Sequence, residues 1–294
     1  MTNTSMQPNT QMQGGYAAKR RAANTAIYII LSVMVLIWIF PIFWLLMQSF
    51  RGETGVSKNY IFPKQWTFNN YVKLFNDEHF HYGQWILNTF IVAVVACVVS
   101  TLVILMVSYA LSRLRFKSRK TLLNCGLVLG MFPGFMSMAA TYNLMNTFGL
   151  AKSLVGLVIV YSAGAGLGYQ VSKGFFDTIP RSLDEAAKID GATKNQIFWR
   201  IILPLSKPII VYTALTTFIG PWGDYIFVSY FMKQHSENWT VALGLYNMLE
   251  KEYIFDYFTT FCAGAVFIAI PITILFIFMQ KFYVAGVTGG AVKG

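Results

Sequence analysis

A short polar stretch between two hydrophobic runs carries the residues of this chain whose types and spacing favour a specific interaction. It reads EAAKIDGATKNQIFWRIILP over 185–204. Glu185 offers a carboxylate, which accepts strong, charge-assisted hydrogen bonds. The small side chains of Ala186 and Ala187 favour a helix and let another surface approach closely, and Gly191 permits a bend. These residues predict a docking element.

Two short helices joined at Gly191 are expected to position these residues at a membrane surface. Ser182 and Glu185 predict a capping box for the first helix, and Thr193 and Gln196 predict one for the second. The second helix is expected to run to the apolar end of the stretch, where proline interrupts the chain.

The composition is that of a membrane protein. Apolar residues make up 55% of the 294 residues and charged residues only 12%, and the mean hydropathy is +0.52. A soluble domain carries about 25% charged residues. A transmembrane helix needs about 20 apolar residues, so the chain is long enough for several spans.

The charged residues are segregated, and the intervals between them predict six transmembrane helices. Pro133, within the third, predicts a bend there. Residues 1–23 are expected to form a disordered tail, and residues 24–283 a six-span domain with a polar loop at 177–204. A glycine-rich tail follows at 284–294. The expected spans are 26–49, 86–112, 121–142, 153–173, 206–228 and 258–280.

Basic residues are distributed unequally between the two sides of these spans. Sixteen of the 23 lysines and arginines fall on the side of the termini and of the 177–204 loop, and seven fall on the other side. The positive-inside rule therefore places both termini and this loop in the cytoplasm. The net charge of +11 is explained by this topology, so it does not require a nucleic-acid partner.

Motifs for catalysis or nucleotide binding are missing from the sequence. No Gly-Lys dipeptide occurs, so the chain has no phosphate-binding loop of the usual type. It also lacks a Gly-x-Ser-x-Gly elbow and an HExxH motif. The cysteines fall within apolar spans and are expected to be small core residues without a metal: Cys97, Cys125 and Cys262.

The spacing EAA-x3-G-x9-I-x-LP resembles the cytoplasmic loop of binding-protein-dependent ABC importer permeases. In that family the loop receives an ATPase subunit, and its glutamate pairs with an ATPase arginine, a role that falls on Glu185. The resemblance implies an all-α integral membrane protein with the type I ABC importer permease fold. The residues expected to couple to the ATPase are Glu185, Ala186, Ala187, Asp190, Gly191, Ile201, Leu203 and Pro204.

Two further segments resemble the carbohydrate-importing branch of the family. They are Met131-Phe132-Pro133 and the glycine-rich end 286–294, which is similar to that of MalG-type permeases of maltose and maltodextrin importers. This resemblance implies a prokaryotic cell membrane and four partners: a MalF-type second permease, two ATPase subunits and an external sugar-binding protein. ATP and magnesium would bind the ATPase, and this chain would hold no cofactor.

Asp224 is the only acidic residue within an expected span. Together with Trp222, Tyr225 and Pro133 it is a candidate for the lining of the translocation path. An equally weighted interpretation makes Asp224 an interfacial residue beside an aromatic belt.

The outer loop before the sixth span is a candidate contact for the binding protein. Trp239, Tyr246 and Glu250 give it the aromatic and acidic mixture of a contact surface, although an ordinary solvated loop remains an alternative. The rival functions are an importer permease for a non-sugar solute and a membrane-embedded enzyme or assembly factor. The latter would need a polar catalytic cluster at one membrane face, which the sequence does not show.

Overall fold

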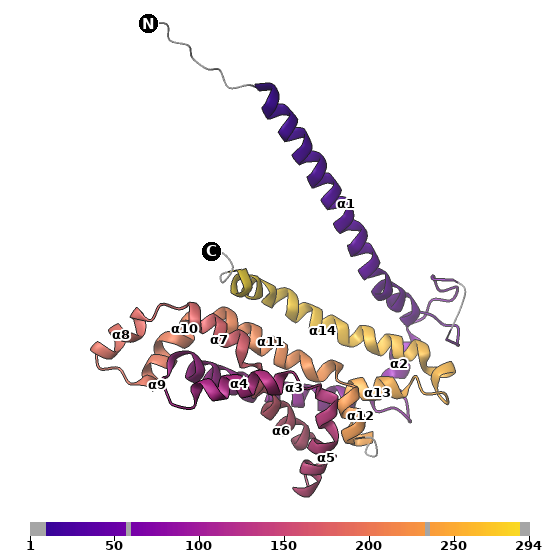
Figure 1. Cartoon of the computed structure of the whole chain (residues 1–294). Coiled ribbons are helices and arrows are strands. Elements are labelled where there is room, and N and C mark those ends of the chain that lie inside the picture. The colour runs from indigo at the N-terminus through magenta and orange to yellow at the C-terminus, as the bar shows by residue number, and fades with distance from the viewer. Residues whose placement is uncertain (1–9, 57–59, 233–235, 289–294) are drawn as a thin grey trace.

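The computed structural model describes residues 10–56, 60–232 and 236–288, and these residues form an all-helical protein (Figure 1). Their only β-pairing is an isolated bridge between Arg51 and Trp66. The helices run between two opposite ends of the molecule. One end carries α8 (Ser182–Ile189), α9 (Lys194–Ile197) and α10 (Leu203–Leu205), and the other carries α2 (Asn69–Asn76), α12 (Ile226–Met232) and α13 (Val241–Asn247).

Four helical segments are long and apolar enough to cross a membrane. They are α1 (Thr10–Ser49), α3 (Tyr82–Arg113), the continuous stretch α6–η2–α7 and α14 (Ile254–Thr288). The continuous stretch consists of α6 (Leu154–Ala165), the 3-10 turn η2 (Gly166–Gly168) and α7 (Tyr169–Thr178). A backbone in lipid must satisfy its own hydrogen bonds, and a helix does so within one segment. The expectation of several apolar membrane helices is confirmed.

The segment around Pro133 is broken, as the sequence predicts. Here α4 (Arg119–Gly130) ends, and the 3-10 turn η1 (Gly134–Ser137) leads into α5 (Met138–Thr147). The axes on either side differ by 96°. Proline removes a backbone donor and clashes with the preceding turn, so the helix that began at Arg119 cannot continue through it.

A second sharp bend separates the polar loop from α11 (Lys207–Gly223). The segment Lys194–Leu205 and α11 meet at 84°, with Ser206 between them. Between α9 and α10 the chain forms one π-helical turn, η3 (Phe198–Ile202), and Pro204 is the second residue of α10. If each bent pair counts as one span, the described residues contain up to six spans.

The end that carries α2 and α13 is held together by buried polar contacts. The amide of Asn70 donates to the carbonyl oxygens of Ser49 and Arg51, at 2.9 and 2.7 Å. Thr259, on α14, donates to the Asn70 carbonyl oxygen at 3.0 Å. One buried side chain therefore ties together the end of α1, α2 and α14. The 3-10 turn η4 (Ser236–Asn238) leads into α13 beside them.

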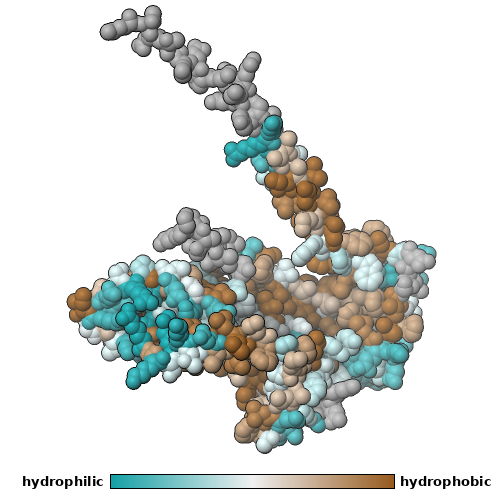
Figure 2. Space-filling view, viewed as in Figure 1, coloured by the Kyte–Doolittle hydropathy of each residue, from teal (hydrophilic) through white to brown (hydrophobic). Residues whose placement is uncertain are grey.

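The first helix stands apart from the rest of the molecule for most of its length (Figure 1). It is apolar, yet its side chains are exposed from Lys19 to Ile42, and Figure 2 shows it as a largely hydrophobic arm. It begins at Thr10, within the segment expected to be a disordered tail. The remainder of that tail, 1–9, and the end of the glycine-rich tail, 289–294, lie outside the described residues.

The cysteines do not share one environment. Cys262 is buried, Cys97 is half-buried and Cys125 is exposed. The expectation of a core residue is therefore wrong for Cys125, because α4 packs closely at Gly126 while Cys125 beside it lines an open groove between α4 and α3.

Candidate functional site

The polar loop forms two short helices, as expected, but only one of the two predicted caps is present. Thr193 accepts from the Gln196 backbone at 3.2 Å, and the Gln196 side chain accepts from the Thr193 backbone at 2.8 Å. This capping box is confirmed. The predicted box of Ser182 and Glu185 is wrong, because Arg181 already occupies the N-cap position and no side chain caps the helix. Ser182 therefore lies inside the first turn.

Gly191 makes the bend between the two helices by adopting a left-handed backbone conformation. Its φ is +81°, and a Cβ built there would meet nothing within 4 Å. The requirement for glycine is therefore conformational rather than steric. Its N–H donates to the Lys188 carbonyl at 3.1 Å, and the Ala192 N–H donates to the Ala187 carbonyl at 2.9 Å. These bonds satisfy carbonyls at the end of α8.

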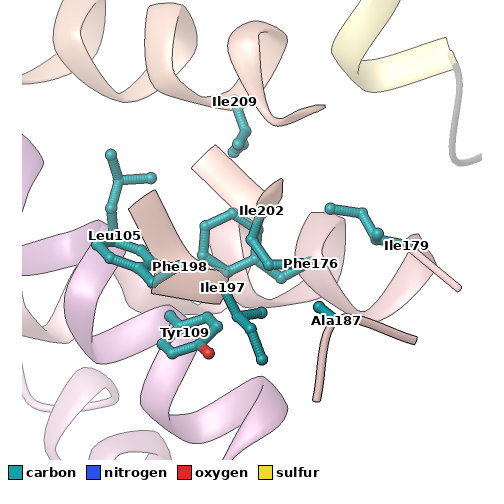
Figure 3. Close-up of a cluster of buried hydrophobic side chains, with 9 residues drawn as sticks. All are labelled: Leu105, Tyr109, Phe176, Ile179, Ala187, Ile197, Phe198, Ile202 and Ile209. Carbon is teal, nitrogen blue, oxygen red and sulfur yellow. The ribbon is translucent and has the colours of Figure 1, made fainter. Parts of the chain in front are cut away.

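A buried hydrophobic cluster fastens the loop to the long helices (Figure 3). Ala187 comes from α8, and Ile197 and Ile202 come from the second helix of the loop. They contact side chains of α3, α7 and α11. Because these contacts are buried, the loop has little freedom to move separately from the long helices. The loop residues Ile201 and Leu203 pack against the cluster and are partly buried. The other buried members are Leu105, Tyr109, Phe176, Ile179, Phe198 and Ile209.

Polar contacts at the end of α3 reinforce this attachment. The Arg113 guanidinium lies 3.2 Å from the Asp184 carboxylate and also donates to the carbonyl oxygens of Phe176 and Ile179, at 2.6 and 2.8 Å. The Tyr109 hydroxyl donates to the Lys194 carbonyl at 3.0 Å. Sequence reasoning missed Arg113 and Asp184 because the pair joins segments far apart in the chain.

Three of the eight residues expected to couple to the ATPase lie on the outward face of α8 or at its C-cap. Glu185, Ala186 and Asp190 are exposed there. Ile189, which the sequence analysis did not single out, is 87% exposed on the same helix. This face therefore combines carboxylates, a small side chain and an exposed isoleucine, and a partner surface can reach all of them. Pro204 is exposed farther along the loop.

Glu185 also lines a cavity of about 350 Å³ between α8, α9 and the end of α3. Five basic residues line the same cavity, so an incoming partner would meet both positive and negative charges there. The basic residues that line this cavity are Arg113, Arg115, Arg181, Lys188 and Lys194.

At the opposite end, a second cavity of about 530 Å³ brings together residues from two predicted groups. Tyr225 was a candidate for the translocation path, and Trp239, Tyr246 and Glu250 were candidates for binding-protein contact. All four line this cavity, and the rings of Tyr225 and Tyr246 stack with centroids 3.9 Å apart. The arrangement offers aromatic surface together with hydroxyl and carboxylate groups, which is typical of a small-molecule site.

The other path candidates do not line this cavity. The two carboxylate oxygens of Asp224 accept from the Tyr161 hydroxyl at 2.9 Å and from the Phe227 backbone N–H at 3.1 Å. Asp224 thus joins α6 to the first turn of α12. Trp222 packs against Phe218. Pro133 lies at the α4–η1 break, where the neighbouring apolar side chains are exposed.

Comparison with known proteins gives one family match. Residues 14–289 match the family described as "Binding-protein-dependent transport system inner membrane component". The galactooligosaccharides transport system permease protein GanQ of Bacillus subtilis is 38% identical, with 91% of this chain and 94% of GanQ covered. The maltodextrin transport system permease protein MalD of Streptococcus pneumoniae is 35% identical, with 96% of this chain and all of MalD covered.

Solved structures show the same fold. A chain from the crystal structure of a bacterial ABC transporter involved in the import of the acidic polysaccharide alginate superposes with a TM-score of 0.74. The match covers 95% of this chain and 100% of that one, at 21% sequence identity. At this identity the likeness concerns the arrangement of the helices.

Proposed function

The chain belongs to the family of binding-protein-dependent transport system inner membrane components, and from this premise we propose that it is a permease subunit of an ATP-driven sugar importer. The observation that carries this proposal is the exposed face of α8, presented on a loop that is fastened to the long helices. Such a loop suits a subunit that receives motion from a partner. This chain would be a non-catalytic subunit.

Coupling to the ATPase would use the exposed face of α8. Glu185 is free to accept charge-assisted hydrogen bonds from an ATPase arginine, and Ala186 leaves room for a close approach. Ile189 would supply apolar contact area at the same surface. ATP and magnesium would bind to two ATPase subunits, and this chain would hold no cofactor.

The motion would pass from α8 into the membrane through the buried cluster. Ala187 and Ile197 pack against Tyr109 of α3 and Phe176 of α7. Because α6, η2 and α7 form one continuous helical stretch, a displacement of α8 would tilt helices that reach the opposite end. Well-packed interiors transmit strain rather than absorbing it.

A six-span arrangement with cytoplasmic termini accords with this mechanism. The final helix, α14, starts beside α13 and runs back towards the end that carries α8 (Figure 1). The first helix, α1, ends beside α2, and its start lies nearer to the side of the view that carries α8 (Figure 1). The surplus of basic residues at the same end supports a cytoplasmic location in the cell membrane of a prokaryote.

The solute would be a sugar, with an oligosaccharide of the maltodextrin type as the first candidate. The relatives' names support this class.

The cavity at Tyr225 and Tyr246 offers stacked aromatic rings beside polar groups and lies at the end opposite α8. It would be reached by sugar released from an external binding protein that contacts Trp239 and Glu250. A second, MalF-type permease would complete the path. A non-sugar solute is the alternative.

Reconstituted transport tests the proposal. The chain would be co-expressed with a second permease, an ATPase and a binding protein from the same organism. Uptake of labelled maltodextrins, galactooligosaccharides and an amino-acid mixture would then be compared. ATP-dependent uptake of one of the sugars supports the proposal. Uptake of amino acids alone, or of no solute despite full assembly, would contradict it.

A further inference from the structure

The loop between α3 and α4 forms a basic hollow that the coupling mechanism does not use. The hollow measures about 470 Å³ and is lined by Arg115, Phe116, Lys117, Arg119, Lys120 and Leu123. No acidic residue lines it, and the ion pairs among the described residues include none of its four cations. Arg119 interacts electrostatically with Asp177, but Arg115, Lys117 and Lys120 are exposed, so the hollow presents a net positive charge.

An apolar groove of about 390 Å³ adjoins this hollow. Phe116 lines both, so the two spaces meet at its ring. The groove runs between α3, α4 and the η2–α7 junction, and its exposed lining is almost wholly apolar. Leu111 of α3, Cys125 and Gly126 of α4 and Tyr169 of α7 are among its lining residues.

Close packing at one glycine fixes the shape of the groove. A Cβ added at Gly126 would lie 2.8 Å from the Tyr169 hydroxyl oxygen, and that hydroxyl donates to the Leu123 carbonyl at 3.3 Å. Glycine thus lets α4 approach α7 closely here, while Cys125 beside it remains exposed towards the groove. The Arg119 guanidinium donates to the Leu111 carbonyl at 2.7 Å, which holds the basic hollow against the mouth of the groove.

We propose that the hollow and the groove together bind one anionic phospholipid, with its phosphate among the cations and an acyl chain along the groove. The basic hollow favours a negatively charged headgroup, because basic pockets beside membrane helices on the cytoplasmic side bind anionic lipids. The occupant must be charged at one end and apolar at the other, in the order that a lipid of the inner leaflet presents. A zwitterionic lipid would leave the excess positive charge uncompensated.

The binding site is distinct from the docking face of α8. Arg115 also lines the cavity beside Glu185. Lys117 and Lys120 line the basic hollow but not that cavity. These two lysines are therefore the residues to change. Lys19 and Arg20 offer a matched control, because they are exposed, carry the same charge and lie in the apolar helix α1, away from the hollow.

The experiment measures lipid retention by the whole transporter complex. Wild-type complex in mixed phosphatidylglycerol and phosphatidylcholine nanodiscs is expected to retain phosphatidylglycerol preferentially after detergent transfer, as counted by native mass spectrometry. Each neutralised lysine of Lys117→Gln/Lys120→Gln should weaken this retention about fivefold. Lys19→Gln/Arg20→Gln removes the same charge from the membrane surface without touching the hollow, so it should weaken retention less than Lys117→Gln/Lys120→Gln, and equal weakening would contradict the proposal. Cys125→Phe fills the groove without changing charge and should also reduce retention.

Three further results would overturn the proposal. Retention of phosphatidylglycerol by Lys117→Gln/Lys120→Gln at the wild-type level would show that the hollow is not the headgroup site. Equal retention of the two lipids by the wild type would remove the electrostatic argument. Loss of the second permease from the Cys125→Phe complex, with lipid retention unchanged, would assign the groove to a protein partner instead. The comparison of the two lipids needs only the wild-type complex, so it tests the proposal even if a variant fails to assemble.

Discussion

The guanidinium of Arg113, at the end of α3, lies 3.2 Å from the carboxylate of Asp184 in the first turn of α8. Both side chains are largely buried, with 3% and 11% of their side-chain surface exposed. Arg113 also donates to two carbonyl oxygens at the end of α7. A single arginine thus links two membrane helices to the helix that presents Glu185.

Replacing Arg113 with methionine should detach α8 from α3. Removing one partner of a buried ion pair leaves the other charge unpaired, at a cost of roughly 3 kcal/mol. We expect a lower unfolding temperature of the purified complex and a loss of ATP-driven uptake. Lys173→Gln is the control, because it removes the partly exposed Lys173–Asp177 pair, which should contribute about 0.5 kcal/mol or less. Equal effects of the two substitutions would contradict this role for Arg113.

Replacing Gly191 with alanine should strain the bend between α8 and α9. A left-handed conformation costs a residue with a Cβ roughly 1–2 kcal/mol. Gly174→Ala is the matched control, because Gly174 lies in α7 and its added Cβ also meets nothing within 4 Å. Thermal unfolding and ATPase co-purification should weaken for Gly191→Ala alone. If the Gly174 variant suffers as much, the φ of Gly191 is not what the site requires.

The sequence predicted the parts of the molecule that depend on local chemistry. The break at Pro133, the Thr193–Gln196 capping box and the apolar helices follow from backbone sterics, side-chain hydrogen bonds and hydropathy, which act over a few residues. The Ser182–Glu185 box failed because Arg181 extended the helix by one residue, a difference that propensity alone does not resolve.

The contacts that assemble the candidate sites could not be predicted in this way. Arg113 meets Asp184, and Tyr225 stacks on Tyr246, only after distant helices pack together. The two residues of each pair are far apart in the sequence, and the hydrophobic periodicity of a helix gives no information about such contacts. The exposure of Ile189 was equally hidden, since an isoleucine in a short amphipathic helix is expected to face the core. The same holds for Cys125, whose apolar neighbours predicted burial.

Replacing Gly244 with alanine should disturb the end of the molecule opposite α8. A Cβ at this position would overlap the Trp85 ring, and overpacking costs roughly 1–3 kcal/mol. Gly220→Ala is the control, because that glycine is also helical and has open space around it. A reduced unfolding temperature is expected for the first variant only. An unchanged temperature for Gly244→Ala would show that α13 does not depend on close contact with α3.

Reporter fusions should establish the orientation of the spans. Because basic residues concentrate on one side, a fusion after Lys120 or at Gly294 should be cytoplasmic, whereas fusions at about Gln65 or Glu237 should be external. Alkaline phosphatase and green fluorescent protein provide the complementary readouts. A cytoplasmic signal at Glu237 would contradict the six-span arrangement.

The central claim is that the exposed face of α8 couples this subunit to an ATPase, and one variant tests it most directly. Glu185→Lys places a positive charge opposite the proposed arginine and removes hydrogen bonds that contribute roughly 1.5–3 kcal/mol. Sugar uptake and ATPase co-purification should be measured together on the assembled transporter. We predict that uptake falls and the ATPase is lost or uncoupled, while the helices still insert. Normal uptake with wild-type retention of the ATPase would contradict the account.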